Sequence, residues 1–161
     1  MRKSLTVVMV MALALFLTTP AMAQPQSGAL MEKDVFTPLT LGYGFMQEGK
    51  YEAAEYEFKK ALNADEFNSF ALNNIAVLEE RKGNYKSAMA YLDDAGRYAD
   101  RYLDKVHQTC FIGGLCAAVK PVRQIGTESE IAKVVAENLA KLKAKMKAIP
   151  KKPEPSKPPK M

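Results

Sequence analysis

The sequence predicts an all-α protein built from helical hairpin repeats and closed by a C-terminal capping helix. Three observations support this fold class. A set of matched residues recurs with a period of 34, small residues occupy fixed places in each period, and a helix-periodic apolar stripe follows near the C-terminus. The 161 residues, of which 48% are hydrophobic, are enough for one domain with tails. That hydrophobic content excludes a wholly disordered chain.

The N-terminus is predicted to be an export signal rather than part of the fold. Residues 1–23 combine a basic start, an apolar run over 5–17 and a small-x-small site ending at Ala23. We expect cleavage after Ala23 and export, most simply to the periplasm, which permits disulfides. Residues 24–34 would then form an N-terminal linker, and the mature chain would carry no transmembrane segment.

Two repeat units are predicted, over 35–68 and 69–102. The small positions let helix backbones approach closely, and the matched glycines Gly49 and Gly83 would end the first helix of each unit. The matched pairs are Leu41 and Ile75, Gly42 and Ala76, Gly49 and Gly83, Tyr51 and Tyr85, Ala54 and Ala88, Phe58 and Leu92, and Ala61 and Ala95. This pattern resembles the tetratricopeptide repeat (TPR) family, and the resemblance implies two antiparallel helices per unit, as in a fragment of an α-solenoid.

The resemblance also implies a peptide-binding groove. In TPR proteins the first helices of the repeats line a concave face, and asparagine amides there can donate to and accept from a peptide backbone. The corresponding positions here are Leu39, Tyr43, Met46, Gln47, Asn73, Asn74, Val77, Glu80 and Arg81. Because Arg81 lacks basic companions, we do not expect recognition of a C-terminal carboxylate. An alternative is that the chain's own residues 24–34, with Val35 and Phe36, fill this face.

A connection over 103–126 contains both cysteines, and we predict that they form a disulfide. In a continuous helix the Cα atoms of Cys110 and Cys116 would lie about 9 Å apart. A disulfide needs less than about 7 Å, so the chain must bend at the two glycines between them. A thiol-redox pair or a metal site with His107 is a less favoured alternative, since the spacing is not Cys-x-x-Cys and a fourth ligand is lacking.

The C-terminal part is predicted to contain one amphipathic helix and a tail. Residues 127–149 would form the helix that caps the repeats, and residues 150–161, rich in proline and lysine, would be disordered. The apolar stripe of this helix is Ile131, Val135, Leu139, Leu142 and Met146. The rival interpretations are a helix that lies on a membrane or another subunit, and a tail that docks weakly to a membrane or cell wall.

Charge and motif content favour a binding protein over an enzyme. Residues 35–102 carry eight basic and eleven acidic residues, whereas 103–161 carry twelve and five. No catalytic constellation, phosphate-binding loop, metal set or cofactor motif is recognisable, and nucleic acid is not an expected partner. We therefore predict a non-catalytic adaptor, scaffold or assembly factor that binds an unidentified envelope protein or peptide. The alternative is a self-associating structural subunit, that is, a homo-oligomer.

Overall fold

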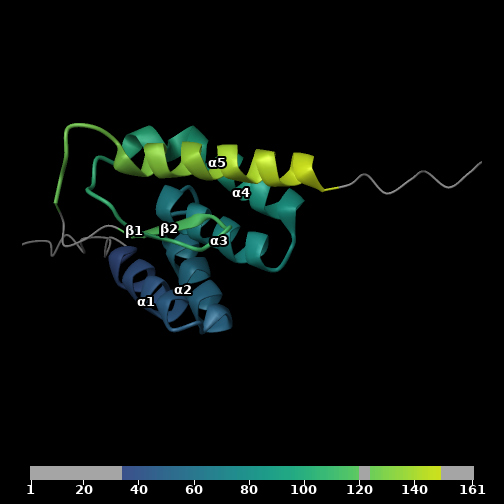
Figure 1. The fold of residues 1–161 in the computed structure, drawn as a ribbon. Coiled ribbons are helices and arrows are strands. Elements are labelled where there is room, and N and C mark those ends of the chain that lie inside the picture. The colour runs from purple at the N-terminus through teal and green to yellow at the C-terminus, as the bar shows by residue number, and fades with distance from the viewer. Residues whose placement is uncertain (1–33, 120–123, 150–161) are drawn as a thin grey trace, which may run out of the picture. The chain divides into compact units, whose positions relative to one another are not determined.

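The all-α fold class is confirmed by the computed structural model, which describes residues 34–119 and 124–149 (Figure 1). The predicted signal peptide, nearly all of the predicted linker and the predicted C-terminal tail lie outside the described residues. Within the described part, five α-helices, one short 3-10 helix and one two-stranded antiparallel sheet belong to a single compact unit.

Two consecutive helical hairpins occupy the predicted repeats. The first consists of α1 (Phe36–Gln47) and α2 (Tyr51–Ala64), and the second of α3 (Ser69–Arg81) and α4 (Tyr85–Tyr98). A short helix, η1 (Ala99–Arg101), follows α4. The helices of each hairpin pack on each other, and α2 packs on α3, so that the two units stack in chain order.

Glycine determines both the turns and one close helix contact. Gly49 and Gly83 follow α1 and α3 with φ of +74° and +82°, a conformation that only glycine adopts readily. Gly42 lies on α1 against the ring of Phe58, and a Cβ built at Gly42 would come within 2.5 Å of that ring. The small residue predicted at this position is therefore required by the large one opposite it.

The connection between the repeats and the last helix forms a β-hairpin, which the sequence analysis does not anticipate. Strand β1 (His107–Cys110) pairs antiparallel with β2 (Cys116–Val119), and Cys110 lies opposite Cys116. All four residues of β2 are buried, because the strand packs on α3, α1 and α5. Its small side chains, Cys-Ala-Ala-Val, allow a strand to lie this close to three helices.

The last helix, α5 (Glu130–Ala148), lies inside the range predicted for the cap and packs mainly on α4. Ser129 is its N-cap and accepts a hydrogen bond from the Ala132 amide at 3.2 Å. Three stripe residues, Ile131, Val135 and Leu142, are at most 1% exposed. No helix in the described part of the chain is both long enough and apolar enough to cross a bilayer.

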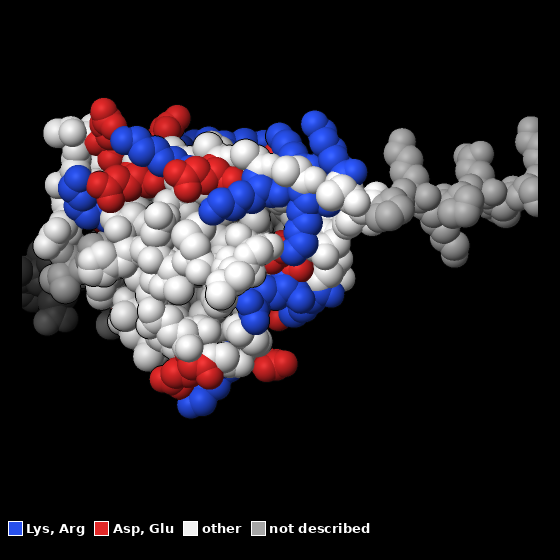
Figure 2. Space-filling model, in the orientation of Figure 1, with Lys and Arg blue, Asp and Glu red and all other residues white. Residues whose placement is uncertain are grey.

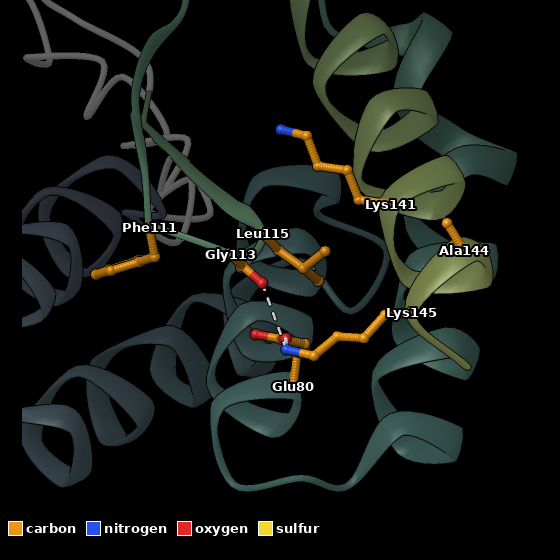
Figure 3. A pocket seen from close by; sticks show the side chains of 8 residues that line it. Glu80, Phe111, Gly113, Leu115, Lys141, Ala144 and Lys145 are labelled. Carbon is orange, nitrogen blue, oxygen red and sulfur yellow. Dashed lines mark hydrogen bonds and ion pairs between the residues drawn. The ribbon is translucent and has the colours of Figure 1, made fainter. Parts of the chain in front are cut away.

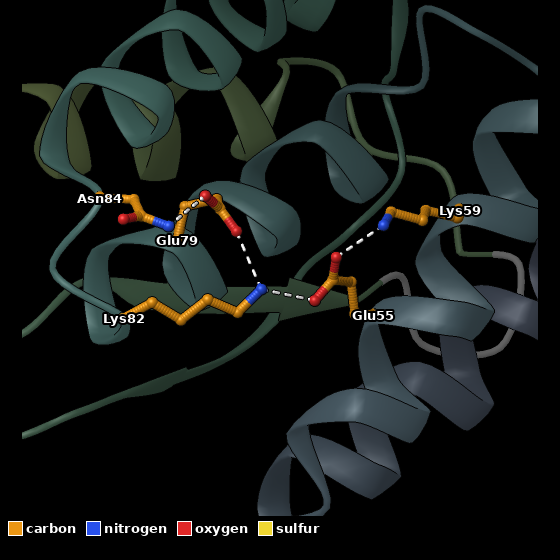
Figure 4. A network of polar contacts seen from close by, with 5 residues as sticks. All are labelled: Glu55, Lys59, Glu79, Lys82 and Asn84. Carbon is orange, nitrogen blue, oxygen red and sulfur yellow. Dashed lines mark hydrogen bonds and ion pairs between the residues drawn. The ribbon is translucent and has the colours of Figure 1, made fainter.

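A network of polar and charged side chains joins the two repeats (Figure 4). The Lys82 ammonium, after α3, lies 2.6 Å from a Glu55 oxygen on α2 and 2.9 Å from a Glu79 oxygen. Lys59 and Asn84 donate to the remaining oxygens of these two carboxylates. The hydrogen bonds from Lys59 and Lys82 lower the pKa of the Glu55 carboxyl.

Charge is also unevenly distributed along α5. Figure 2 shows basic side chains gathered over the end of α5 that precedes the C-terminal tail, where Lys141, Lys143, Lys145 and Lys147 lie in the sequence. Acidic residues stand at the opposite end, at Glu128 and Glu130. This arrangement complements the helix dipole at both ends.

Candidate functional site

Most of the nine residues predicted to line a peptide groove are buried, and the chain's own β-hairpin contacts several of them. Leu39, Asn73, Asn74 and Val77 are 0% exposed, and Met46 and Glu80 are at most 4% exposed. The remaining three, Tyr43, Gln47 and Arg81, are half-buried or exposed at the edge. The prediction of an open groove is thus corrected, since β2 packs against this face. The alternative that residues 24–34 fill the face lies, except for Asp34, outside the described residues.

Asn74 binds the main chain of β2 in the way expected for a bound peptide. Its side-chain amide donates to the Ala118 carbonyl at 2.7 Å, and its side-chain oxygen accepts from the Ala118 amide at 2.8 Å. One side chain thereby pairs both main-chain groups of a buried residue, as a neighbouring strand would. The chemistry expected of this asparagine is present, and its ligand is the chain itself.

Asn73 and Asn138 hold the other end of β2. Asn138, on α5, accepts from the Cys116 amide at 2.8 Å and donates to the Cys116 carbonyl at 2.8 Å. Asn73 donates to the same carbonyl at 3.0 Å and accepts a second hydrogen bond from Asn138. Every buried side-chain nitrogen and oxygen in the described residues has a partner, so this network is fully satisfied.

Asn138 was not among the predicted site residues, although the sequence carries a signal for it. It is 0% exposed and lies three residues after Val135, within the face that buries the apolar stripe. A polar residue on such a face has to find hydrogen-bond partners in the core. Its partner is a strand that the sequence pattern does not reveal.

Strand β1 is held far more loosely than β2. Its residues are exposed or half-buried. Its side-chain contacts to the repeats come through Thr109, whose hydroxyl lies 2.6 Å from the Tyr43 hydroxyl and accepts from Gln47 at 3.4 Å. The rim residues of the predicted groove, Tyr43 and Gln47, thus contact the outer strand of the hairpin.

The predicted disulfide is present and joins the two strands. Cys110 and Cys116 are bonded, with Cα atoms 3.9 Å apart, and Gly113 turns the chain between them with φ of +67°. The bend expected at the glycines is thus formed by a β-turn rather than by a helix break. The two sulfurs differ in setting, because Cys110 is exposed whereas Cys116 is 0% exposed and its Sγ lies 3.1 Å from the Lys141 ammonium.

The hairpin tip borders a pocket of about 530 Å³ between α3 and α5 (Figure 3). At its base the buried Glu80 carboxylate forms an ion pair with Lys145, which also contacts the Gly113 carbonyl at 3.4 Å. The hydrogen bond to Glu80 raises the pKa of Lys145. The lining is Glu80, Phe111, Gly113, Gly114, Leu115, Lys141, Ala144 and Lys145.

Beside this pocket, Arg81 fixes the tip to the first repeat. Its guanidinium lies between two rings, 4.4 Å from the Tyr51 centroid and 4.5 Å from the Phe111 centroid, and donates to the Tyr51 hydroxyl at 2.6 Å. Ile112, which follows Phe111 at the tip, is fully exposed at 107%. Sequence reasoning placed Arg81 in a groove and gave Phe111 and Ile112 no role.

The described residues contain no group of three or more His, Cys, Asp or Glu side chains arranged to hold a metal ion. Both cysteines are engaged in the disulfide. His107, the third member of the alternative metal set, lies on β1 opposite Val119. The three residues are therefore not brought together as thiolate and imidazole ligands.

Comparison with known proteins gives one distant relative. No protein-family model and no solved structure matches the chain. A stretch of 84 residues, 52% of the chain, is 31% identical to a protein named cellulose synthase operon protein C from Komagataeibacter xylinus. The matched stretch spans 6% of that protein's length, so the similarity concerns a short segment of a much longer chain.

Proposed function

We propose that this protein is an exported, TPR-like interaction module that binds another protein of the cell envelope without catalysing a reaction. The helical hairpins and their 34-residue period support the family relation, and the distant relative supports an interaction or scaffold role. The N-terminal sequence pattern supports export. Because the concave face is filled, the proposed binding surface lies elsewhere.

The observation that carries this proposal is the hairpin-tip surface, which consists of Arg81, Phe111, Ile112 and Lys145. A fully exposed isoleucine stands there beside an aromatic ring and an arginine, and Phe111 and Lys145 also line the pocket described above. Exposed apolar and aromatic side chains next to arginine are the composition of binding hot spots. A partner's apolar side chain would fill the pocket and cover Ile112.

The tip is also held in one conformation before any partner arrives. The disulfide closes the hairpin behind it, Arg81 stacks on Phe111, and Lys145 contacts the Gly113 carbonyl. Binding then orders few additional groups, which reduces its entropic cost. This rigidity favours a docking surface over a surface loop without a role.

The test compares two isoleucine variants by in-cell cross-linking in the envelope fraction. Ile112→Asp puts a charge on the tip, and Ile125→Asp puts the same charge on another exposed isoleucine, 78% exposed. We expect the cross-linked partner to be lost with Ile112→Asp and retained with Ile125→Asp, with both variants as helical as the parent. Equal capture by both variants would contradict the tip surface.

The same samples test the alternative of self-association. Light scattering over a range of concentrations measures the mass of the purified protein and of both variants. A constant monomer mass agrees with a binding module for another protein. A concentration-dependent mass that Ile112→Asp abolishes would replace the proposed partner with a second copy of this chain.

Export is tested separately, by sequencing the N-terminus of the protein recovered from the envelope. The proposal predicts a mature chain that starts at Gln24. A full-length chain in the cytoplasmic fraction would contradict it.

A further inference from the structure

The two ends of the disulfide differ in their access to solvent. Cys110 is exposed on the outer strand β1, whereas Cys116 is 0% exposed on β2 and covered by helices. Of the two cysteines, Cys110 is therefore the one that a thiolate can approach from solvent. Exchange at a disulfide requires such access along the bond axis to one sulfur.

The buried end is arranged to receive negative charge. The Lys141 ammonium lies 3.1 Å from the Cys116 sulfur, and no carboxylate in the described residues forms an ion pair with Lys141. A nearby ammonium stabilises a thiolate over a thiol and lowers the thiol pKa. A sulfur with a lower thiol pKa is the better leaving group in exchange.

The fold is also arranged to survive cleavage of the bond. The main chain of Cys116 is held by Asn73 and Asn138, and that of Ala118 by Asn74. None of these hydrogen bonds involves β1. Breaking the disulfide would free the outer strand and the tip while β2 stays in the core.

From these three features we propose that the Cys110–Cys116 disulfide is a thiol–disulfide exchange site whose substrate is the dithiol of another protein. One thiolate of that dithiol attacks the Cys110 sulfur, a mixed disulfide forms, and the bond to Cys116 breaks. Cys116 leaves as a thiolate paired with Lys141. This site does not depend on the partner proposed for the hairpin tip.

The second half of the exchange returns the partner as a disulfide. The partner's second thiolate attacks the partner sulfur that is bonded to Cys110. The partner's own disulfide forms, and Cys110 is released. Two electrons pass from the dithiol to this protein. One proton of the dithiol ends on Cys110 and the other passes to solvent, because Cys116 stays a thiolate beside Lys141. The reverse reaction re-forms the hairpin disulfide with a partner disulfide as oxidant.

The test uses reduced glutathione as the probe thiol and the native, oxidised full chain. The reaction is quenched with acid at intervals, and peptide mapping by mass spectrometry locates the glutathione adduct. We expect the adduct on Cys110. An adduct on Cys116, or reaction only after denaturant is added, would overturn the proposal.

Two lysine variants measured in the same assay distinguish stabilisation of the leaving thiolate by Lys141 from a general effect of positive charge. Lys141→Met removes the ammonium next to the sulfur, and Lys143→Met removes an exposed ammonium two residues away. We expect exchange to slow about tenfold in Lys141→Met, since its leaving thiolate is less stable. Lys143→Met should react within about twofold of the parent. Equal rates in the parent and Lys141→Met would overturn the role of Lys141 and, with it, the proposal.

Discussion

The first helices of the two repeats share one sequence pattern but not one environment. Four of the 12 residues of α1 are buried, compared with 11 of the 13 residues of α3. Both helices are followed by a glycine with positive φ, and both pack on the second helix of their own unit. Strand β2 contacts both helices, but α3 in addition packs on α2 of the preceding unit and on α5, which accounts for the difference.

This difference teaches that position in the stack, rather than the repeat motif, determines how much of a helix is buried. Two repeats alone would leave much of α3 in water, and stacked repeats generally need a third unit or a cap. Here β2 covers one face of α3, and α5 covers α4. The hairpin thus replaces the missing repeat, at the cost of the peptide groove.

The largest expected effect separates equivalent positions of the two repeats. Thr40 and Asn74 lie 34 residues apart and so occupy equivalent places in the two repeats, but Asn74 binds buried main chain and Thr40 is exposed. Asn74→Ala leaves the Ala118 amide and carbonyl without partners and should lower the free energy of unfolding by about 3 kcal/mol. Thr40→Ala should change it by less than about 0.5 kcal/mol. Urea unfolding measures the free energy of unfolding of both variants. Similar losses in the two would show that these positions do not differ in the way proposed.

The next effect compares two glycines on α1 and predicts opposite signs. Alanine at Gly42 would clash with the Phe58 ring, whereas a Cβ at Gly44 meets nothing within 4 Å. We expect Gly42→Ala to destabilise by about 1–2 kcal/mol, because overpacking outweighs the gain in helix propensity. Gly44→Ala should stabilise by about 0.5–1 kcal/mol. Thermal unfolding gives both values. A stabilising Gly42→Ala would show that the contact between Gly42 on α1 and Phe58 on α2 is loosely packed.

The smallest effect concerns the charged network between the repeats. Glu55 pairs with Lys59 and Lys82, and its pKa is lowered from the usual 4.5. Since the folded pKa is below the unfolded one, this stability is present above about pH 4.5 and is lost as the pH falls through the lowered pKa. Glu55→Gln should therefore cost up to about 1 kcal/mol at pH 7 and nothing in acid.

The control for this network is Glu137→Gln, an exposed carboxylate in the middle of α5 and so away from the helix ends. No ion pair of Glu137 occurs in the described residues, so its substitution should leave the unfolding midpoint unchanged at both pH values. Chemical unfolding at pH 7 and pH 3 makes the comparison. A cost for Glu55→Gln that persists at pH 3 would show that the effect is not electrostatic.

The helices follow from the sequence because their signals are local. The 34-residue period, the glycines after α1 and α3, and the apolar stripe over 127–149 each depend on residues close in the chain. The disulfide also follows, since Gly113 permits the turn that six residues of helix do not. These features need no knowledge of distant contacts.

The β-hairpin cannot be predicted from the sequence, because its strands are stabilised by contacts with residues distant in the chain. His-Gln-Thr-Cys and Cys-Ala-Ala-Val show no alternation of apolar and polar residues, and the second pairs its main chain with Asn73, Asn74 and Asn138. The sequence indicates that the Asn73–Asn74 pair binds a main chain. It cannot indicate that the main chain is its own.

The central claim is that β2 is a permanent part of the core and not a removable lid on a groove. Native-state amide hydrogen exchange tests it most directly, at the Cys116 and Ala118 amides that donate to Asn138 and Asn74. We predict that both amides exchange as slowly as those of α3, through global unfolding alone. Exchange of these two amides as fast as that of the exposed Gly113 amide at the tip would contradict the claim and reopen the concave face to a peptide.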